Sequence, residues 1–395
     1  MLDATKSNRI ETELVTGNSH HAETNVKVHR RMDVLTGKAI LFAPSRGDRP
    51  NQFTESCRPN EVPPDTACPF CRGAESQTPK TVWAGKVSSS ATRGELDFET
   101  AQGELANSIP DWLVRVVPNK YPAVNLGETT NNHSKKNCKS DSLFQSAEAF
   151  GAHEVVIESP RHVSESKQLD LAEATLTYHA FRDRIANWYD HPQIKYISAF
   201  KNSGAAAGAS LVHTHSQLIA TDFLPPGVAN QIERMNHHRA KTGCCLHCDL
   251  LRAELAESTR IVAKTEHLVA YCPFACSSPL MIRIVPIAHQ SRFSEASNKT
   301  VEELARLVSR ISCWIDQLCP GTAHNVLLHT QPPAAEGSED SFHWNLEFVP
   351  RLTSLAGFEF SSDCVINPLL PEKAAKLYRG CSDAESPRKV VSPIR

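Results

Sequence analysis

A glycine-led turn followed by alternating polar side chains is the segment with the clearest capacity for chemistry. Residues 208–217 read Gly-Ala-Ser-Leu-Val-His-Thr-His-Ser-Gln, so His213, His215 and Gln217 stand two residues apart. Residues two apart in a strand point to the same face, and backbone N–H groups in a glycine turn can approach a phosphate closely. The segment therefore predicts phosphate chemistry at a histidine, with these three side chains on one strand face. A buried strand with two structural histidines is the alternative.

An internal repeat surrounds this segment. Each half of the chain carries a Cys-x-x-Cys pair followed by two histidines: Cys68, Cys71, His162 and His213 in the first half, and Cys245, Cys248, His289 and His343 in the second. From residue 162 to residue 213 is 51 positions, and from residue 289 to residue 343 is 54. The matched order and spacing predict two copies of one strand–helix–strand unit, related by pseudo-symmetry.

The repeated cysteines and histidines predict two zinc sites. Two thiolates and two imidazoles are the ligand set of a closed, tetrahedral, structural zinc site. We therefore expect two Zn²⁺ per chain, and the alternative is that the same residues are metal-free core side chains. Cys244 and His247 compete as ligands of the second site, and His153 is a possible substitute for His162 in the first.

The two halves differ where a nucleophile would stand. His215 and Gln217 of the first half correspond to Asn345 and Glu347 of the second, so only the first half has an imidazole at this position. An imidazole whose one ring nitrogen donates to a carbonyl exposes the other nitrogen for attack. We predict that His215 is the nucleophile and that Gly208, Ser210 and Gln217 bind the phosphoryl oxygens. The metal would position the nucleophile rather than activate water.

The surrounding elements predict an α+β fold, a mainly antiparallel sheet with packed helices built from two pseudo-repeated units. Apolar and β-branched runs predict strands over 38–44, 112–118, 153–159, 196–200, 216–221, 267–272, 280–286, 325–329 and 342–350. Apolar residues three and four apart predict helices over 169–188, 228–241, 301–318 and 371–379. Residues 87–107 and 127–142 lack this periodicity and predict surface excursions.

Composition and charge set the outer bounds. The 395 residues carry a formal charge of −2, which gives no basic surface for nucleic acid, and no apolar run reaches the roughly 20 residues that span a bilayer. The first 25 residues lack the apolar core of a secretory signal, so we expect a cytoplasmic protein whose 13 cysteines bind metal rather than form disulfides. We expect a loose leader (1–25), a first half (26–225), a second half (226–380) and a loose tail (381–395).

From about residue 29 to residue 379 the chain resembles galactose-1-phosphate uridylyltransferases, a branch of the histidine-triad superfamily. The residues that carry the resemblance are Cys68-x-x-Cys71, Ser159-Pro-x-His162, Asn202-x-Gly204-x-x-x-Gly208-x-Ser210, His213-x-His215-x-Gln217, Leu35-Thr-Gly-Lys38 and Ala43-Pro-Ser-Arg46-Gly-Asp-Arg49-Pro. The resemblance implies a ping-pong reaction through a nucleotidyl-His215. It also implies that Asn202, Ser210 and Gln217 contact the phosphates and that Asn119 lies near the nucleoside. The expected partners are a nucleotide sugar, a sugar 1-phosphate or phosphate, and a second copy of the chain.

The chain departs from the best-known bacterial transferases at three places. Thr214 stands where their His-Pro-His motif has proline, and the second metal set contains cysteines where theirs has Glu and His. The segment around Glu359 lacks their sugar-supporting glutamine, so Glu359 itself is a candidate partner for sugar hydroxyls, with a plain surface carboxylate as the alternative. These features are similar to the subgroup that includes plant ADP-glucose phosphorylase.

The predicted activity is uridylyl transfer between UDP-glucose and galactose 1-phosphate, with ADP-glucose phosphorolysis as the named alternative. A histidine-triad hydrolase is a further alternative, but such proteins carry a histidine where Gln217 stands, and glutamine cannot protonate a leaving group. A zinc-stabilised binding module without catalysis is the last, and it gives no reason for His215 beside a phosphate turn.

Overall fold

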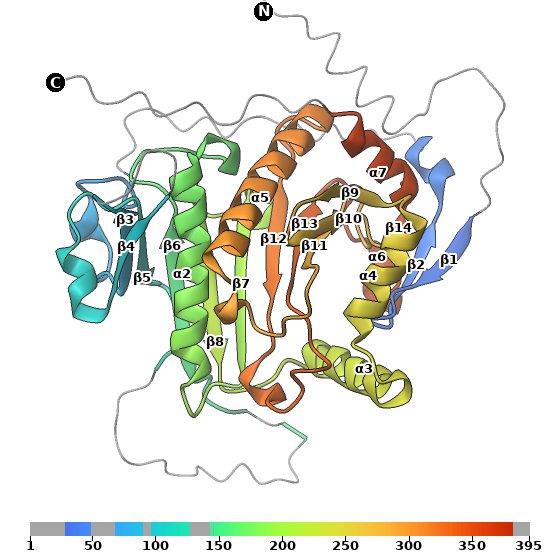
Figure 1. Ribbon diagram of the computed structural model, residues 1–395, viewed down its shortest axis with the longest axis horizontal. Helices are drawn as coiled ribbons and strands as arrows, with labels where there is room; N and C mark the ends of the chain where they lie inside the picture. The colour runs from blue at the N-terminus through green and yellow to red at the C-terminus, as the bar shows by residue number, and fades with distance from the viewer. Residues whose placement is uncertain (1–27, 49–67, 90–95, 127–142, 145, 382–395) are drawn as a thin grey trace, which may run out of the picture.

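A computed structural model describes residues 28–48, 68–89, 96–126, 143–144 and 146–381. The predicted leader, most of the predicted tail and the predicted excursion over 127–142 lie outside these residues. One large sheet runs through the molecule, with helices laid across it (Figure 1). None of the helices in the described ranges is long and apolar enough to cross a bilayer.

The large sheet has eleven strands, and every pairing within it is antiparallel. In spatial order the strands are β4 (Phe98–Gln102), β3 (Trp83–Val87), β5 (Val114–Pro118), β6 (Gly151–Ile157), β8 (His215–Thr221), β7 (Tyr196–Ser203), β12 (His324–His329), β13 (Asn345–Pro350), β11 (Ile282–Pro286), β10 (Leu268–Tyr271) and β9 (Ile261–Lys264). The mainly antiparallel α+β class predicted from the sequence is confirmed.

The internal repeat is visible in the strand order. In the first half β5 and β6 are followed by helix α2 (Leu171–Tyr189) and then by β7 and β8. In the second half β10 and β11 are followed by helix α5 (Asn298–Leu318) and then by β12 and β13. The orders β5-β6-β8-β7 and β10-β11-β13-β12 are the same, and β7 pairs with β12 to make one continuous sheet.

Helices α2 and α5 lie side by side on one face of this sheet (Figure 1). Helix α2 starts at a capping box, in which Asp170 accepts from the Glu173 amide at 2.8 Å and Glu173 accepts from the Asp170 amide at 2.9 Å. Helix α5 is capped by the preceding residue, Ser297, whose hydroxyl accepts from the Thr300 amide at 3.1 Å. The apolar faces of both helices join the sheet in the main core, where full burial of one leucine or isoleucine contributes about 1.5–3 kcal/mol.

The remaining helices flank the second half. They are α3 (Pro226–Thr242), α4 (Leu246–Glu257), α6 (Gly357–Ser362) and α7 (Pro371–Arg379). Helices α3 and α7 were expected from periodicity, whereas α4 and the short α6 were not. Cys248 lies in the first turn of α4, and this segment was predicted only to hold metal ligands.

A second, three-stranded sheet ties the N-terminal segment to the second half. It contains β1 (His29–Met32), β2 (Ala39–Phe42) and β14 (Val365–Asn367), with β14 parallel to β2. Ile40 and Phe42 pack with Cys276 and Met281, and Arg31 pairs with Glu372 at 2.9 Å. Residues 29–42 were expected within the first half, and they pack against the second.

The expectation of a surface excursion over residues 87–107 is corrected by strand β4, which lies in this range. Strand β4 is the edge of the large sheet and pairs only with β3, from Trp83 opposite Gln102 to Val87 opposite Phe98. Most of its residues are exposed or half-buried. Because an edge strand with little buried surface needs few apolar residues, its sequence carries no alternating pattern.

Candidate active site and metal centres

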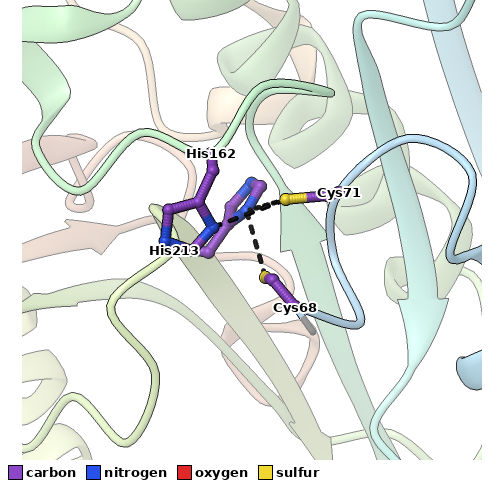
Figure 2. Close-up of side chains that lie close together, drawn as sticks. All are labelled: Cys68, Cys71, His162 and His213. Atoms are coloured by element: carbon purple, nitrogen blue, oxygen red, sulfur yellow. Dashed lines mark hydrogen bonds between the residues drawn. The ribbon is translucent and has the colours of Figure 1, made fainter. Parts of the chain in front are cut away.

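The first cysteine–histidine set forms one compact cluster (Figure 2). Cys68 and Cys71 come from the turn before β3, His162 from the loop after β6, and His213 from the turn before β8. The Nδ1 atom of His213 lies 3.4 Å from the sulfur of Cys68 and 3.6 Å from that of Cys71. The Nδ1 atom of His162 lies 3.4 Å from the sulfur of Cys71.

The second set repeats this arrangement. The sulfur of Cys248 lies 3.4 Å from Nδ1 of His289 and 3.5 Å from Nδ1 of His343, and Cys245 completes the cluster. In each cluster all four ligand atoms lie within 4.8 Å of one another. The two predicted sets of four residues are thus brought together as the repeat implied, from turns and strand ends far apart in the sequence.

The clusters fit zinc by distance and by tautomer. Zinc bonds of about 2.3 Å to sulfur and about 2.0 Å to nitrogen, held tetrahedrally, give sulfur–nitrogen separations of about 3.5 Å. Both buried histidines turn Nδ1 toward the sulfurs while Nε2 donates to a backbone carbonyl, at 3.0 Å from His213 to Ser159 and at 3.1 Å from His343 to Pro286. Such bonds fix the ring orientation of a metal ligand. Burial lowers the pKa of His213 to about 4, which keeps its ring neutral and able to bind metal.

The competing ligands considered from the sequence stand outside both clusters. His153 bonds instead to Gln217 and to the Ala123 amide. His247 is buried beside the ring of His343, with 6.0 Å between ring centroids, and its Nδ1 has no hydrogen-bond partner. Geometry therefore selects His162 for the first cluster, and Cys245 with Cys248 for the second.

His215 is the first residue of β8 and is 6% exposed. Its Nδ1–H donates to the carbonyl of His213 at 2.8 Å, so the lone pair is on Nε2. Burial lowers the pKa of His215, with the Lys201 ammonium adding to the effect, although the bond to the His213 carbonyl opposes it. The ring is therefore neutral near pH 7, as a nitrogen nucleophile must be.

The expectation that His213 and His215 share a strand is wrong, because β8 begins at His215 and His213 lies in the preceding turn. The ladder stops there because the Thr214 amide donates to the Val163 carbonyl at 2.7 Å, in the loop that also carries His162. The two rings nevertheless lie on the same side, since each packs edge-on against Phe70 at 5.9 Å and 5.4 Å between centroids.

The glycine-led turn has the conformation that requires glycine. Gly204 and Gly208 have φ of 83° and 92°, a region that other residues rarely adopt. At Gly204 a Cβ would also lie 2.9 Å from the Cβ of Ala323. Ser210 and Gly208 are exposed on this turn, where their polar and backbone groups can meet a ligand.

A groove of about 540 Å³ lies beside His215. Its walls include His215, Asn202, residues of the glycine turn, residues 321–324 and Arg351. Asn325 donates to Oδ1 of Asn202 at 2.8 Å and accepts from Nε of Arg351 at 2.5 Å. Asn202 is thus held by the second half of the chain, and a guanidinium lies close behind it. A larger groove of about 1130 Å³ runs along α3 and α4, away from His215.

Gln217 and Asn119 both lie next to the ring of His153. The Nε2 atom of His153 lies 2.8 Å from Oε1 of Gln217 and 3.1 Å from Nδ2 of Asn119, while its Nδ1 accepts from the Ala123 amide at 3.1 Å. Because Nδ1 is an acceptor, Nε2 carries the proton and donates to Gln217. The NH₂ group of Gln217 takes no part in this bond. Glu359 does not line the groove near His215, and its carboxylate accepts from the Ala356 amide at 3.0 Å.

The equivalent place in the second half holds an ion pair. Asn345 stands where His215 stands, and Glu347 pairs with Arg283 at 2.6 Å and with His329 at 3.3 Å. Although burial alone opposes ionisation, Arg283 and the bond from His329 hold the pKa of the Glu347 carboxyl far below its ordinary value. A charged pair occupies this place in the second half, so only the first half has an imidazole at the start of the corresponding strand.

Comparison with known proteins places the chain in a family. ADP-glucose phosphorylase from Arabidopsis thaliana is 30% identical over 353 residues, covering 89% of this chain and 92% of the relative. Galactose-1-phosphate uridylyltransferase from Haemophilus influenzae is 28% identical and covers 90% of this chain and 95% of its own. The chain belongs to the galactose-1-phosphate uridylyltransferase family. Residues 123–379 also match a family described as a domain of unknown function, DUF4921.

Solved structures of the galactose-1-phosphate uridylyltransferase family agree with the fold. A crystal structure of an ADP-glucose phosphorylase from Arabidopsis thaliana, with bound ADP-glucose, has a TM-score of 0.71 at 29% identity and covers 90% of this chain and 100% of its own. A uridylyltransferase structure has a TM-score of 0.62 at 23% identity, covering 89% of this chain and 97% of its own, and supports the fold alone.

Several residues of this family member's site were not found from the sequence. Arg351 lines the groove from the second half, and Asn325 holds it and Asn202 together only because β7 pairs with β12. His153 was considered only as a metal ligand. Glu158 and Lys201, which lie beneath the nucleophile turn, were not singled out, because a glutamate and a lysine near strand ends usually lie on the surface.

Proposed function

We propose that this chain is a nucleotidylyltransferase that forms a covalent nucleotidyl-His215, and that its reaction is the phosphorolysis of ADP-glucose. The observation that carries the covalent step is the bond from Nδ1–H of His215 to the His213 carbonyl, which leaves Nε2 with a lone pair beside the groove. The similarity to ADP-glucose phosphorylase over 89% of the chain supports the choice of substrate.

In the first step Nε2 of His215 attacks the α-phosphorus of ADP-glucose. The bond from this phosphorus to the bridging oxygen breaks, glucose 1-phosphate leaves, and AMP stays on the ring as a phosphoramidate. In the second step an oxygen of inorganic phosphate attacks the same phosphorus, the nitrogen–phosphorus bond breaks, and ADP leaves. Each step needs in-line geometry and charge neutralisation more than a strong base.

The residues of the site have separate proposed roles. Asn202, Ser210, Gln217 and the Gly208 backbone bind the phosphoryl oxygens, and Asn119 lies near the nucleoside. A contact of Glu359 with sugar hydroxyls stays a prediction from the sequence, because Glu359 lies outside the groove beside His215. Both cysteine–histidine clusters bind zinc, which when bound cross-links distant turns and so fixes the position of His215. A homodimer stays a prediction from the sequence, which sedimentation of the full chain tests.

Uridylyl transfer from UDP-glucose to galactose 1-phosphate, the activity ranked first from the sequence, is now the second candidate. Its support is the uridylyltransferase relatives, among them one from Thermotoga maritima that is 29% identical over 268 residues, or 66% of this chain. We rank the phosphorylase first because the ADP-glucose phosphorylase is 30% identical over 353 residues, whereas the uridylyltransferases from Thermotoga maritima and Haemophilus influenzae are 29% and 28% identical.

A four-way assay distinguishes the two activities. ADP-glucose and UDP-glucose are each incubated with inorganic phosphate or with galactose 1-phosphate, and the released nucleotides and sugars are quantified. We expect the combination of ADP-glucose and phosphate to be fastest by a wide margin. Faster turnover of UDP-glucose with galactose 1-phosphate would replace the proposed activity by the second candidate. Equal release in water without any acceptor would indicate a hydrolase.

A further inference from the structure

A buried polar network lies directly beneath the nucleophile turn. Glu158 follows β6, Lys201 lies on β7, and Thr214 and Ser216 flank His215 at the start of β8. The Lys201 ammonium and the hydroxyls of Thr214 and Ser216 all donate to the Glu158 carboxylate, Thr214 at 2.6 Å, and Lys201 also donates to the Thr214 hydroxyl. The residues before and after His215 are therefore anchored to a single carboxylate.

All four side chains are almost completely buried. Glu158 is 1% exposed, Ser216 2%, Thr214 3% and Lys201 6%. Burial alone raises the pKa of the Glu158 carboxyl, but the Lys201 ammonium and the three donated bonds bring it below its ordinary value. A buried ion pair of this kind stabilises a fold little or not at all compared with well-packed apolar residues. Stability therefore gives no reason for its presence.

The second half of the chain supplies an internal comparison. Ser216 lies opposite Val156 and Lys201 in the ladders of the first half, and Leu346 lies opposite Ile284 and Leu328 in those of the second. Leu346 and Leu328 thus correspond to Ser216 and Lys201. By the same register the counterparts of Thr214 and Glu158 are Trp344 and Pro286.

These four positions are apolar in the second half, and Leu328, Trp344 and Leu346 are 4%, 0% and 0% exposed in the main core. The second half keeps the same strands and a complete cysteine–histidine cluster without polar side chains at these four positions. Neither the fold nor the metal cluster therefore requires the polar network. The two halves differ at this place because the first has His215 where the second has Asn345.

We propose that Glu158, Lys201, Thr214 and Ser216 are positioning residues that hold His215 in line with the phosphorus of the nucleotide sugar. This inference rests on the proposed function. The network acts on the backbone on both sides of His215, while the bond from His215 to the His213 carbonyl sets the ring. Of the two hydroxyl groups that bond to Glu158, only that of Thr214 also contacts Lys201, so Thr214 is the residue to test.

The test compares Thr214→Val, which keeps the shape and removes the hydroxyl, with Thr214→Ser, which keeps the hydroxyl. The rate of single-turnover labelling of His215 is measured with radiolabelled ADP-glucose and UDP-glucose, together with the KM for each, the melting temperature and the zinc content. We expect Thr214→Val to slow labelling by about 10-fold to 100-fold with an unchanged KM, since small misplacements of reacting groups have effects of this size. Thr214→Ser should recover most of the rate.

Thr177→Val is the matched control, because Thr177 is a buried threonine on α2 whose hydroxyl donates to the Glu173 carbonyl at 3.0 Å. It should match Thr214→Val in melting temperature and zinc content and label at the wild-type rate. A second variant, Glu158→Leu with Lys201→Leu, imitates the second half and should keep its melting temperature while labelling slowly.

Two outcomes separate this inference from the proposed function. Label on the wild-type protein with an equal rate in Thr214→Val, or a slow rate matched by a fall in zinc content, would overturn the positioning role alone. Absence of label on the wild-type protein with both nucleotide sugars would overturn the proposed function, and the positioning role with it.

Discussion

At the scale of single residues, His213 and His215 are neighbours with different partners. His213 turns Nδ1 to the sulfurs of Cys68 and Cys71, and His215 turns Nε2 to the groove while its Nδ1–H bonds to the His213 carbonyl. Backbone hydrogen bonds fix both rings, so each role depends on one ring nitrogen. Variants of the two residues should therefore lose activity for different reasons.

Replacing His215 by asparagine should remove the nucleophile and leave the fold intact, because the second half already carries Asn345 at this place. We expect turnover to fall by at least about a thousandfold, as for other nucleophile deletions. Melting temperature and zinc content should stay at wild-type values. Label from nucleotide sugar on denatured protein, stable to base and labile to acid, should disappear. Persistence of that label in His215→Asn would assign the nucleophile to another residue.

Replacing His213 by asparagine should act through the metal cluster. The variant loses one imidazole ligand that is 1% exposed, and we expect about one zinc fewer per chain by elemental analysis. The melting temperature should fall by about 5 °C or more, since loss of a structural metal ligand costs several kcal/mol. Activity should fall with zinc content. Normal zinc content in His213→Asn would contradict the assignment of this ligand.

At the scale of elements, strand β13 carries the charged Glu347 where β8 carries Gln217. Glu347 on β13 and Arg283 on β11 face each other in the ladder, and their side chains are 14% and 7% exposed. This pair lies between strands of the second half and joins no described part of the groove beside His215. It is therefore a structural feature, whose energetics depend on pH.

Glu347→Gln should destabilise the protein at neutral pH by about 3 kcal/mol, because it leaves Arg283 buried and unpaired. The folded-state pKa of Glu347 is depressed, so its stabilisation is present above the unfolded value of about 4.3 and is lost as the pH falls below that value. The difference in melting temperature between wild type and variant should stay constant from pH 7 to about pH 5 and shrink as the pH falls below about 4.

The surface pair of Glu302 and Arg306 on α5 provides the comparison for this titration. Glu302→Gln should change the melting temperature little at any pH, since exposed ion pairs contribute at most about 1 kcal/mol. A gap between Glu347→Gln and the wild type that stays constant down to acid pH would show that the carboxylate does not carry the effect.

At the scale of the whole molecule, two similar halves share one sheet and divide the work. The first half supplies His215, the proposed nucleophile, and the second supplies Arg351 to the groove and Asn325 behind it, across the junction of β7 and β12. Each half has its own cysteine–histidine cluster, and only the first lies two residues from His215. Loss of the two clusters should therefore have unequal effects on activity.

Cys68→Ser and Cys248→Ser form a matched pair for this expectation. Each variant should lose about one zinc and some thermal stability, because each removes one thiolate from one cluster. Cys68→Ser should also lose most labelling of His215, whereas Cys248→Ser should keep most of it at temperatures where it stays folded. Equal loss of labelling in both variants would mean that the clusters act only through global stability.

The sequence by itself determined the repeat, the two cysteine–histidine sets, the α+β class and the place of His215, because these depend on short motifs and local periodicity. It did not determine edge strand β4, whose exposed residues carry no alternating pattern. Nor did it show that β8 begins at His215 and leaves His213 in the preceding turn. Long-range pairing alone decided the rest. Glu158 follows β6, Lys201 lies on β7 and Thr214 precedes β8, and the three meet only when β8 lies between β6 and β7, which no spacing along the chain reveals. Asn325 reaches Asn202 only because β12 pairs with β7, so the groove is completed by the tertiary structure.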